Sequence, residues 1–545
     1  MKKSKKIVII GGVAAGASCA ARLRRLDETA QILILERGEY VSYANCGLPY
    51  HIGGVISDRD DLIVTKPEKF LAWFNIEVRL HSEVLSIDRA SRRVLVRNIE
   101  KEYFEEYDIL VIATGAKAFS PKTYGDESGR VRHLWTLPDM DGIIASLKTD
   151  SPSVTIVGGG FIGLETAENL RHRGVEVNLV QRSGHVLPVF DAEMARPLAV
   201  ELKNMGVNVL FGRVVKRYEE SEGGIYTILD DGQRLFSNLV ISSTGVKPNS
   251  KLALDADIEC SKDGFIKVDE HMKTSDPNIY AAGDVVEIAE PIFNSKTHIP
   301  LAGPANKQGR IVADNIAGIP SSYKGTYGAS VLKLGSLTAA SVGMTEKRLK
   351  SAGKKYIKIY THPSSSASYY PGATRMDAKL MFSEDGTILG AQIIGQSGVD
   401  KRIDTIAQAM FNGLKAWTLG ELELSYAPPF SSAKDPVNYL GYVASNVLSG
   451  KSTPVYADEI PEGAVILDVR EPSETANGKI PGSVNIPLGQ LRTRLNEIDK
   501  NRLIVCSCQV GLRGYLAERI LKQNGFNAAN LSGGYLTWKA LNSKQ

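Results

Sequence analysis

Two cysteines of this 545-residue chain stand in surroundings that suit a nucleophile. Cys46 lies in VSYANCGLPY (41–50), a polar turn that contains glycine, and the next cysteine along the chain is Cys260. A cysteine in a polar loop can act as a thiolate nucleophile in a reducing compartment. Without a neighbouring cysteine, two chemistries remain open for Cys46. It can cycle through a sulfenic acid, or it can form a mixed disulfide with a small thiol.

Cys508 opens the second candidate site, the C-x-x-G-x-R loop CQVGLR (508–513). The loop follows the β-rich run RLIVCS and precedes a helical run. We expect consecutive backbone N–H groups and the helix N-terminus to face the Cys508 sulfur and stabilise its thiolate. Arg513 closes the loop and is predicted to be catalytic. We interpret Cys19, Cys260 and Cys506 as structural.

A glycine-rich turn near the start of the chain predicts a dinucleotide site. Gly11, Val13 and Gly16 fill the positions of G-x-G-x-x-G, so the central glycine is missing. Such a turn between strand and helix lets a pyrophosphate approach backbone N–H groups at a helix N-terminus. Glu36 stands twenty residues past Gly16, at the end of the next apolar run, where an acid holds ribose hydroxyls.

The same pattern restarts near residue 151 with a complete fingerprint, Gly158, Gly160 and Gly163. The acid expected at the end of its second strand is absent, and Gln181 and Arg182 stand there. Glutamine does not repel a 2′-phosphate and arginine can pair with one. Both NADH and NADPH therefore remain open for this site.

The order of these patterns predicts an α/β chain with two nested Rossmann-like dinucleotide-binding domains, because the second unit interrupts the first. Residues 325–446 alternate short β-like and helical runs as a separate α+β unit, and the last 90 residues or so read as a further α/β unit. The predicted domains are a split first domain (1–118 and 250–324), a second (119–249), a third (325–446), a linker (447–455) and a C-terminal domain (456–545).

Bulk composition is that of an ordinary globular protein, with 43% hydrophobic and 23% charged residues. A net charge of +4 indicates neither a nucleic-acid nor a membrane partner, and no apolar run is long enough to span a bilayer. We interpret the basic start, MKKSKK, as leading into a strand and not as a targeting segment. Five scattered cysteines fit a reducing compartment, so we expect a cytoplasmic protein. No metal site is predicted.

Over residues 5–445 the chain resembles the two-dinucleotide-binding flavoprotein disulfide reductases. That resemblance implies FAD in the first site, NADH or NADPH in the second, and a homodimer formed by the third domain. Most of that superfamily carries two cysteines five residues apart, whereas His51 occupies the second position here. The residues implied for the two cofactors are Gly11, Val13, Ala14, Gly16, Glu36, Arg37, Thr114, Gly115, Gly158, Gly160, Phe161, Ile162, Gly163, Gln181, Gly245, Gly283, Asp284 and Ala302.

The stretch SYANCGLPY closely resembles the active-site segment of coenzyme A disulfide reductases and related persulfide reductases. ASYYPGA (367–373) and ELSYAPPFSSAKD (423–435) resemble the segments that bring two tyrosines to that cysteine from the other subunit. By position the first of these is Tyr369, with its neighbour Tyr370 as the alternative, and the second is Tyr426. A tyrosine hydroxyl can protonate a leaving thiolate. The resemblance also implies coenzyme A contacts at Ser18, Arg22, Arg25, Ser42, Asn45, Asn306 and Lys434.

The C-terminal domain resembles a single-domain rhodanese through LDVREPSE (467–474), IPGSVNIP (480–487), the Cys508 loop and LSGGYLTW (531–538). The combination implies a reductase that passes electrons from NAD(P)H through FAD to Cys46. Its substrate would be a coenzyme A persulfide, and also polysulfide, coenzyme A disulfide or another small persulfide or disulfide. The reaction would pass through a mixed disulfide of Cys46 with coenzyme A, and Cys508 would carry sulfane sulfur to or from coenzyme A. Three other functions stay open, namely a coenzyme A disulfide reductase proper, a peroxidase or oxidase that uses a Cys46 sulfenic acid, and a non-enzymatic redox-sensing scaffold.

Overall fold

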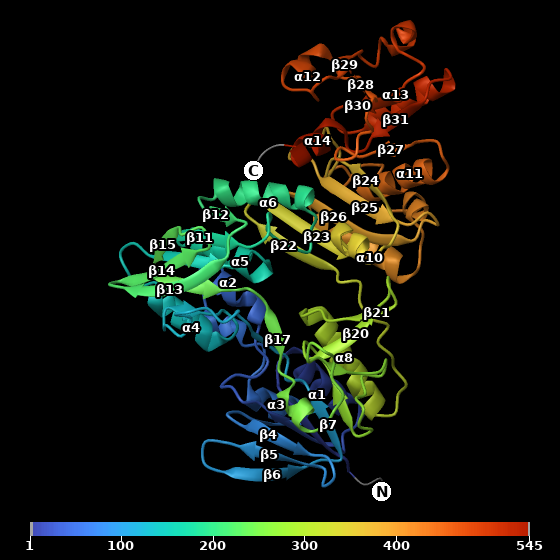
Figure 1. Ribbon diagram of the computed structural model, residues 1–545. Coiled ribbons are helices and arrows are strands. Elements are labelled where there is room, and N and C mark those ends of the chain that lie inside the picture. Colours follow the sequence, from blue (N-terminus) through green and yellow to red (C-terminus); the bar gives the residue numbers. More distant parts are fainter. Residues whose placement is uncertain (1–3, 543–545) are drawn as a thin grey trace. The chain divides into compact units, whose positions relative to one another are not determined.

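The computed structural model describes residues 4–542 in two compact units (Figure 1). The first unit runs to Arg182 and resumes over Gly206–Thr326. The second contains Ser183–Met205 and the chain from Tyr327 onward. The segment that holds α6 (Ala192–Asn204) lies within residues 119–249, the predicted second domain, and groups with the second compact unit.

The first nucleotide-binding domain is built on a parallel sheet of order β19-β7-β1-β2-β3. The strands are β1 (Lys6–Ile10), β2 (Gln31–Leu35), β3 (Glu77–Arg79), β7 (Ile109–Ile112) and β19 (Ile279–Ala281). Their apolar residues are buried on both faces, as continuous Val/Ile/Leu runs predict for a central parallel sheet. Helix α1 (Ala14–Leu26) packs closely on α8 (Ala302–Ile316). The approach is so close that a Cβ on Gly309 would lie 2.3 Å from the Ala15 carbonyl oxygen.

The second nucleotide-binding domain repeats this arrangement in the sheet β12-β11-β10-β16-β9. Its strands are β9 (Val131–Arg132), β10 (Ser153–Val157), β11 (Glu176–Gln181), β12 (Asn208–Phe211) and β16 (Leu239–Ser242), and α5 (Phe161–His172) follows β10. The chain enters and leaves this domain through β8 (Ala116–Ala118) and β17 (Val246–Pro248), which pair antiparallel. The topology thus shows that the second nucleotide-binding domain is inserted in the first.

Smaller elements complete the first unit. An antiparallel sheet β13-β14-β15 covers Val215–Ser221, Gly224–Leu229 and Arg234–Ser237, and another, β4-β5-β6, covers Glu83–Asp88, Arg93–Arg97 and Glu102–Glu106. A third contains β18 (Ile266–Lys267), β20 (Val286–Glu290) and β21 (Ser295–Thr297). The remaining helices are α2 (Leu48–Ile52), α3 (Pro67–Phe74), α4 (Leu137–Ser146) and α7 (Lys251–Asp255).

In the second unit, the third domain has an antiparallel sheet of order β22-β23-β26-β25-β24. These strands are β22 (Ser330–Leu334), β23 (Leu337–Gly343), β24 (Ile357–Thr361), β25 (Asp377–Phe382) and β26 (Ile388–Gly395). The helices are α9 (Glu346–Ser351), α10 (Val399–Phe411) and α11 (Pro436–Leu448). β24 lies at one edge of the sheet.

The C-terminal domain has the parallel sheet β27-β31-β30-β28-β29, drawn in orange and red in Figure 1. Its strands are β27 (Pro454–Val455), β28 (Val465–Asp468), β29 (Val484–Asn485), β30 (Ile504–Ser507) and β31 (Ala528–Leu531), and its helices are α12 (Pro472–Ala476), α13 (Leu512–Gln523) and α14 (Gly534–Asn542). The sheet begins two residues before the predicted boundary at 456. Within the predicted linker, Thr453 donates its backbone N–H to Glu518 at 2.6 Å, so the segment is bound to the domain it precedes.

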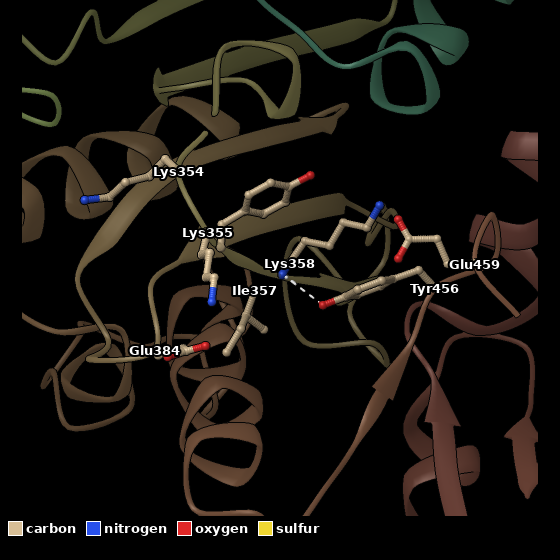
Figure 2. A pocket seen from close by; sticks show the side chains of 8 residues that line it. Lys354, Lys355, Ile357, Lys358, Glu384, Tyr456 and Glu459 are labelled. Carbon is tan, nitrogen blue, oxygen red and sulfur yellow. Dashed lines mark hydrogen bonds between the residues drawn. The ribbon is translucent and has the colours of Figure 1, made fainter. Parts of the chain in front are cut away.

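The C-terminal domain contacts β24 through side chains that accept backbone N–H groups. Lys358 donates its backbone N–H to the Tyr456 hydroxyl at 3.2 Å, as Figure 2 shows, and Tyr360 donates to Ser532 Oγ at 3.1 Å. Beside Tyr456, a cavity of about 340 Å³ is lined by Lys354, Lys355 and Glu459, among others. The C-terminal domain is therefore held against the edge of the third domain's sheet.

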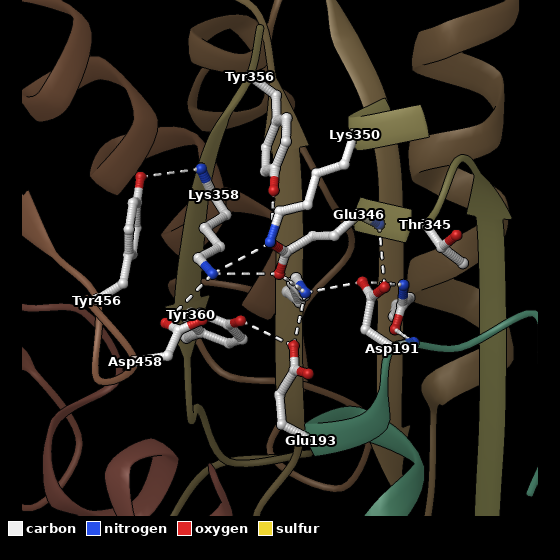
Figure 3. A network of polar contacts seen from close by, with 12 residues as sticks. Asp191, Glu193, Thr345, Glu346, Lys350, Tyr356, Lys358, Tyr360, Tyr456 and Asp458 are labelled. Carbon is white, nitrogen blue, oxygen red and sulfur yellow. Dashed lines mark hydrogen bonds and ion pairs between the residues drawn. The ribbon is translucent and has the colours of Figure 1, made fainter. Parts of the chain in front are cut away.

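A buried ionic cluster lies in the same unit (Figure 3). The Lys379 side chain is fully buried and its Nζ pairs with Asp191 at 2.7 Å, Glu193 at 2.6 Å and also Glu346. These three carboxylates group tightly enough to hold a metal ion, but the Lys379 ammonium takes the cation's place. Lys358 also pairs with Glu346, at 3.1 Å.

No helix within residues 4–542 has the length and apolar character needed to cross a bilayer.

Candidate functional site

Both glycine fingerprints form turns whose first and last positions leave no room for a side chain. Gly11 has φ +96°, and a Cβ there would lie 2.3 Å from the Ala113 carbonyl oxygen. A Cβ on Gly16 would lie 1.9 Å from the Gly11 carbonyl oxygen. Gly158 and Gly163 repeat these two constraints in the second domain. Each turn brings a strand end close to the start of a helix, where a pyrophosphate can bind.

Glu36 and Gln181 occupy equivalent places in the two domains. Glu36 accepts the backbone N–H of Gly12 at 2.9 Å, and Gln181 accepts that of Gly159 at 2.8 Å. Each side chain thus fixes its glycine turn from the end of the neighbouring strand. Arg182 follows Gln181 and is exposed.

These turns fit the two cofactors that the sequence implies. A Cβ built on Gly160 meets no atom within 4 Å, which leaves open space over the start of α5 for a dinucleotide. Neither Val13 nor Gly160, the residues that precede α1 and α5, caps its helix with a side chain. The first N–H groups of both helices are thus left for phosphate oxygens.

The other residues predicted to bind cofactors lie around these turns and at the domain crossing. Ala14 begins α1, Phe161 and Ile162 begin α5, and Ala302 begins α8. Thr114 donates its hydroxyl to the Asn249 carbonyl at 2.8 Å, between the two chain crossings. Three of these predicted residues, Gly115, Gly245 and Gly283, are glycines with positive φ. Arg37 directly follows Glu36. Burial raises the pKa of Asp284 to about 6.

Cys46 lies in a short 3-10 turn, Asn45–Gly47, directly before α2, and is exposed. The pKa of its thiol is raised, first by partial burial of the sulfur and then by the Glu165 and Asp284 carboxylates. This electrostatic influence places Cys46 near acidic groups from both nucleotide-binding domains. None of the five cysteines forms a disulfide in the structure.

A cavity of about 580 Å³ opens beside Cys46 in the first unit. Arg22 lines it and pairs with Asp314 at 2.7 Å, whereas Arg25 on the same helix is exposed. Arg310, which the sequence did not single out, adds a third guanidinium. Of the residues predicted to bind coenzyme A, this cavity brings together Ser18, Arg22, Arg25, Ser42, Asn45 and Asn306.

The two predicted tyrosines lie in the second unit, side by side on its surface. Their hydroxyls are 3.0 Å apart, and Tyr369 and Tyr426 are 75% and 47% exposed. The hydrogen bond between the two hydroxyls raises the pKa of Tyr426. Tyr370 is also exposed, at 40%, and so is Lys434. The pair therefore presents phenol groups at a surface of the third domain.

Glu165 and Tyr50 are candidate site residues that the sequence analysis missed. Tyr50 donates its hydroxyl to Glu165 at 3.3 Å. Burial raises the pKa of Glu165 to about 7; the hydrogen bond from Tyr50 opposes this shift and the nearby Glu168 carboxylate adds to it. A carboxyl that titrates near neutrality beside a thiol can hold or release a proton. The available signal was its place in the chain, two residues after Gly163 on the helix of the second fingerprint.

In the C-terminal domain, Cys508 is buried directly after β30. Its Sγ accepts the backbone N–H of Gly511 at 3.1 Å, and Gly511 has φ +97° and precedes α13. A Cβ on Gly534 would lie 2.3 Å from the Cys508 carbonyl oxygen, so the loop is tightly enclosed. Arg513 pairs with Glu474 through two hydrogen bonds, 2.6 and 2.7 Å long.

The other three cysteines lie away from these two loops. Burial raises the pKa of Cys19 to about 12 and raises that of Cys506 further still. Cys260 is partly buried, and burial raises its thiol pKa as well. Their thiols are thus poor nucleophiles at neutral pH.

Comparison with known proteins identifies the class to which this fold and site belong. Residues 5–309 match the model of the pyridine nucleotide-disulphide oxidoreductases, and residues 330–436 match the dimerisation domain of that family. Residues 453–541 match the rhodanese-like domain. The chain belongs to the pyridine nucleotide-disulphide oxidoreductase family and carries a C-terminal rhodanese domain. Its mixed α/β fold with these domains is as the sequence predicts, and the family implies FAD and NAD(P)H.

Individual relatives narrow the resemblance. The chain is 36% identical over 444 residues to a coenzyme A disulfide reductase from Staphylococcus aureus, and 34% identical over 443 residues to one from Staphylococcus epidermidis. Both alignments cover 81% of this chain and 99% of the relative. A solved structure of reduced CoADR-RHD from Bacillus anthracis is 44% identical, with a TM-score of 0.97 over 99% of this chain and 98% of that one. An NAD-dependent persulfide reductase from A. fulgidus is 36% identical, with a TM-score of 0.92 over 98% and 100%.

Proposed function

We propose that this oxidoreductase reduces coenzyme A persulfide with NAD(P)H and releases hydrogen sulfide. The observation that carries the proposal is Cys46, an exposed cysteine without a disulfide partner, beside a cavity lined by three arginines. Guanidinium groups suit the phosphates of a coenzyme A ligand. The similarity to a persulfide reductase and the rhodanese domain both favour a persulfide over a plain disulfide.

Bound FAD would supply two-electron transfer between nicotinamide and sulfur. Cys46, as its thiolate, attacks the inner sulfur of the persulfide, the sulfur–sulfur bond breaks, and hydrosulfide leaves. Cys46 is then joined to coenzyme A as a mixed disulfide. The two reducing equivalents that originate from NAD(P)H break this second bond.

The protein's own residues bind the substrate and manage its protons. Arg22, Arg25 and Arg310 bind the nucleotide end of coenzyme A. Glu165 receives the proton that Cys46 releases, since a pKa of about 7 lets the carboxyl titrate at working pH.

The two tyrosines and Lys434 complete the site from the partner subunit, because the third domain is the dimerisation domain. Tyr369 and Tyr426 share a hydrogen bond, and one of them donates a proton to the departing coenzyme A thiolate. Replacing either by phenylalanine should lower kcat more than it raises the KM for the acceptor.

The test is anaerobic NADH oxidation with coenzyme A persulfide and coenzyme A disulfide in parallel, with sulfide recorded. Faster turnover of the persulfide, with one sulfide per NADH, supports the proposal. Preference for the disulfide would make the protein a coenzyme A disulfide reductase. Turnover of peroxide or oxygen with a stable sulfenic acid at Cys46 would make it a peroxidase or oxidase.

Two variants divide the chemistry between the cysteines. Cys46→Ser should abolish NADH-dependent reduction. Cys508→Ser should spare reduction of preformed coenzyme A persulfide but block use of sulfur loaded on the rhodanese loop. If Cys508→Ser abolishes both activities, this division of labour is wrong.

A further inference from the structure

We propose that Glu474 sets the donor specificity of the rhodanese loop by neutralising Arg513, which selects organic persulfides against inorganic dianions such as thiosulfate. The inference rests on the proposed function, in which Cys508 carries sulfane sulfur. It adds a selectivity that neither the loop motif nor the domain match specifies.

The first support is the geometry of the Arg513–Glu474 pair. The two terminal nitrogens of Arg513 donate one to each oxygen of Glu474, at 2.7 and 2.6 Å. This two-bond pairing is the strongest arrangement of guanidinium and carboxylate. The hydrogen bonds from Arg513 lower the pKa of Glu474 to about 2, so both partners are charged at neutral pH. Their net charge is zero.

The second support is the composition of the loop. Between Cys508 and Arg513 stand Gln509, Val510, Gly511 and Leu512, none of which carries charge. Arg513 is thus the loop's one cation, and Glu474 already binds it. Leu512 is 54% exposed and offers an apolar surface to a donor's organic part.

A second arginine that contacts the loop is also neutralised. Arg470 is buried and pairs with Asp468 at 2.7 Å. It also donates to Gln509 at 3.1 Å and lies over the Tyr535 ring. Arg470 therefore holds the loop and does not present an uncompensated charge to a donor.

The two donor classes differ in charge through the whole transfer. The Cys508 thiolate attacks the outer sulfur of either donor, and the sulfur–sulfur bond breaks. Thiosulfate arrives as a dianion and leaves as sulfite, also a dianion. The reacting group of an organic persulfide carries no charge or one negative charge when it reaches the loop, and the donor leaves with a single thiolate there, while any carboxylates or phosphates of the donor lie further from the sulfur. Cys508 becomes a persulfide in both cases, and cyanide removes the outer sulfur as thiocyanate. A neutral loop penalises the dianion more.

The test compares thiosulfate with glutathione persulfide as donors to cyanide, using the full-length holoenzyme. Glu474→Gln frees Arg513 from its counter-charge but keeps an oxygen that can accept the Glu471 backbone N–H, which Glu474 binds at 3.1 Å. The ratio of kcat/KM for thiosulfate to that for the persulfide should rise by about tenfold, from one uncovered charge near the surface. Added salt should reduce this gain.

Two further variants separate charge from structure. Glu474→Asp keeps the charge and should restore a ratio near that of the wild type. Glu497→Gln removes the partner of Arg494 from another arginine–glutamate pair, whose shortest contact is 2.7 Å, and should leave the ratio unchanged.

The outcomes that overturn the inference are specific. A ratio in Glu474→Gln within about twofold of the wild type refutes it, as does a wild-type protein that uses thiosulfate as well as the persulfide. If neither donor places sulfur on Cys508, detected by mass as one added sulfur, the proposed role of the rhodanese domain is itself wrong. If Cys508 does take up sulfur but the kcat/KM ratio in Glu474→Gln stays near that of the wild type, only the proposed donor selectivity is refuted.

Discussion

Replacing Lys379 by methionine should strongly destabilise the second unit, because it leaves buried carboxylates without their counter-charge. Lys379 is fully buried and pairs with Asp191, Glu193 and Glu346, the three carboxylates that Figure 3 labels. Methionine fills a similar volume, so a packing defect contributes little. The change therefore measures the electrostatic part of the cluster.

The structure sets the size of the effect. Lysines 379 and 358 lower the pKa of Glu346 from 4.5 to about 2 against the opposing effect of burial, which corresponds to roughly 3 kcal/mol. Removing one partner of a buried ion pair costs about 3–5 kcal/mol in general. For a unit of this size, that predicts a Tm lower by roughly 6–20 °C.

The dependence on pH has a definite sign. Because the pKa of Glu346 is depressed in the folded protein, its ion pairs add stability above the unfolded-state pKa near 4.5, and that stability is lost as pH falls toward 2. The difference in Tm between wild type and Lys379→Met should thus shrink as the pH falls through the acid range toward 2.

Calorimetry of the holoenzyme measures this, with Lys350→Met as the matched control. Lys350 pairs with the same Glu346, at 3.4 Å, but is 58% exposed, so its loss should cost less than about 1 kcal/mol. Equal Tm values for the two variants would refute the reasoning, as would a Lys379→Met protein as stable as the wild type.

Four further substitutions test the nucleotide and thiol sites. Glu165→Gln should lower the apparent pKa of Cys46, because one of the carboxylates that raise it is removed, and the pH dependence of Cys46 alkylation measures this; an unmoved profile would contradict it. Gly160→Ala should keep the Tm but raise the KM for NADH about tenfold or more, since the added Cβ enters the open space over the helix where the dinucleotide would bind. Gly163→Ala, in contrast, should fail to fold, because its Cβ would lie 1.9 Å from the Gly158 carbonyl oxygen. Arg182→Glu should reduce kcat/KM for NADPH relative to NADH, and an unchanged ratio would show that Arg182 does not contact a 2′-phosphate.

The nucleotide-binding domains could be predicted from sequence because their constraints are local. In each turn the two constrained glycines lie within six residues of each other, namely Gly11 and Gly16 in the first turn and Gly158 and Gly163 in the second. The geometry of the turn requires glycine at these positions. The nesting of the two sheets could also be predicted, because the second strand–turn–helix pattern interrupts the first along the chain. Parallel strands need crossover connections, and these give each sheet its own recognisable pattern.

The pairings that sequence could not predict join distant parts of the chain. Lys379 meets Asp191 across 188 positions, and Tyr50 meets Glu165 across 115. A lysine inside the buried strand β25 gives no sign of its partner from sequence alone. Glu474 lay within a recognised stretch, but its bond to Arg513 depends on how α12 and the Cys508 loop approach each other.

The contacts of the rhodanese domain with β24 have an effect that is independent of sulfur chemistry, because they cover an edge of the third domain's sheet. β24 ends the antiparallel sheet, and an open sheet edge is a template for pairing with other chains. Tyr456 and Ser532 occupy the outward N–H groups of Lys358 and Tyr360, which would otherwise face water. The fused domain thus protects the edge against aggregation, and a chain cut after Leu448 would need a charge, a proline or a partner there to remain monodisperse.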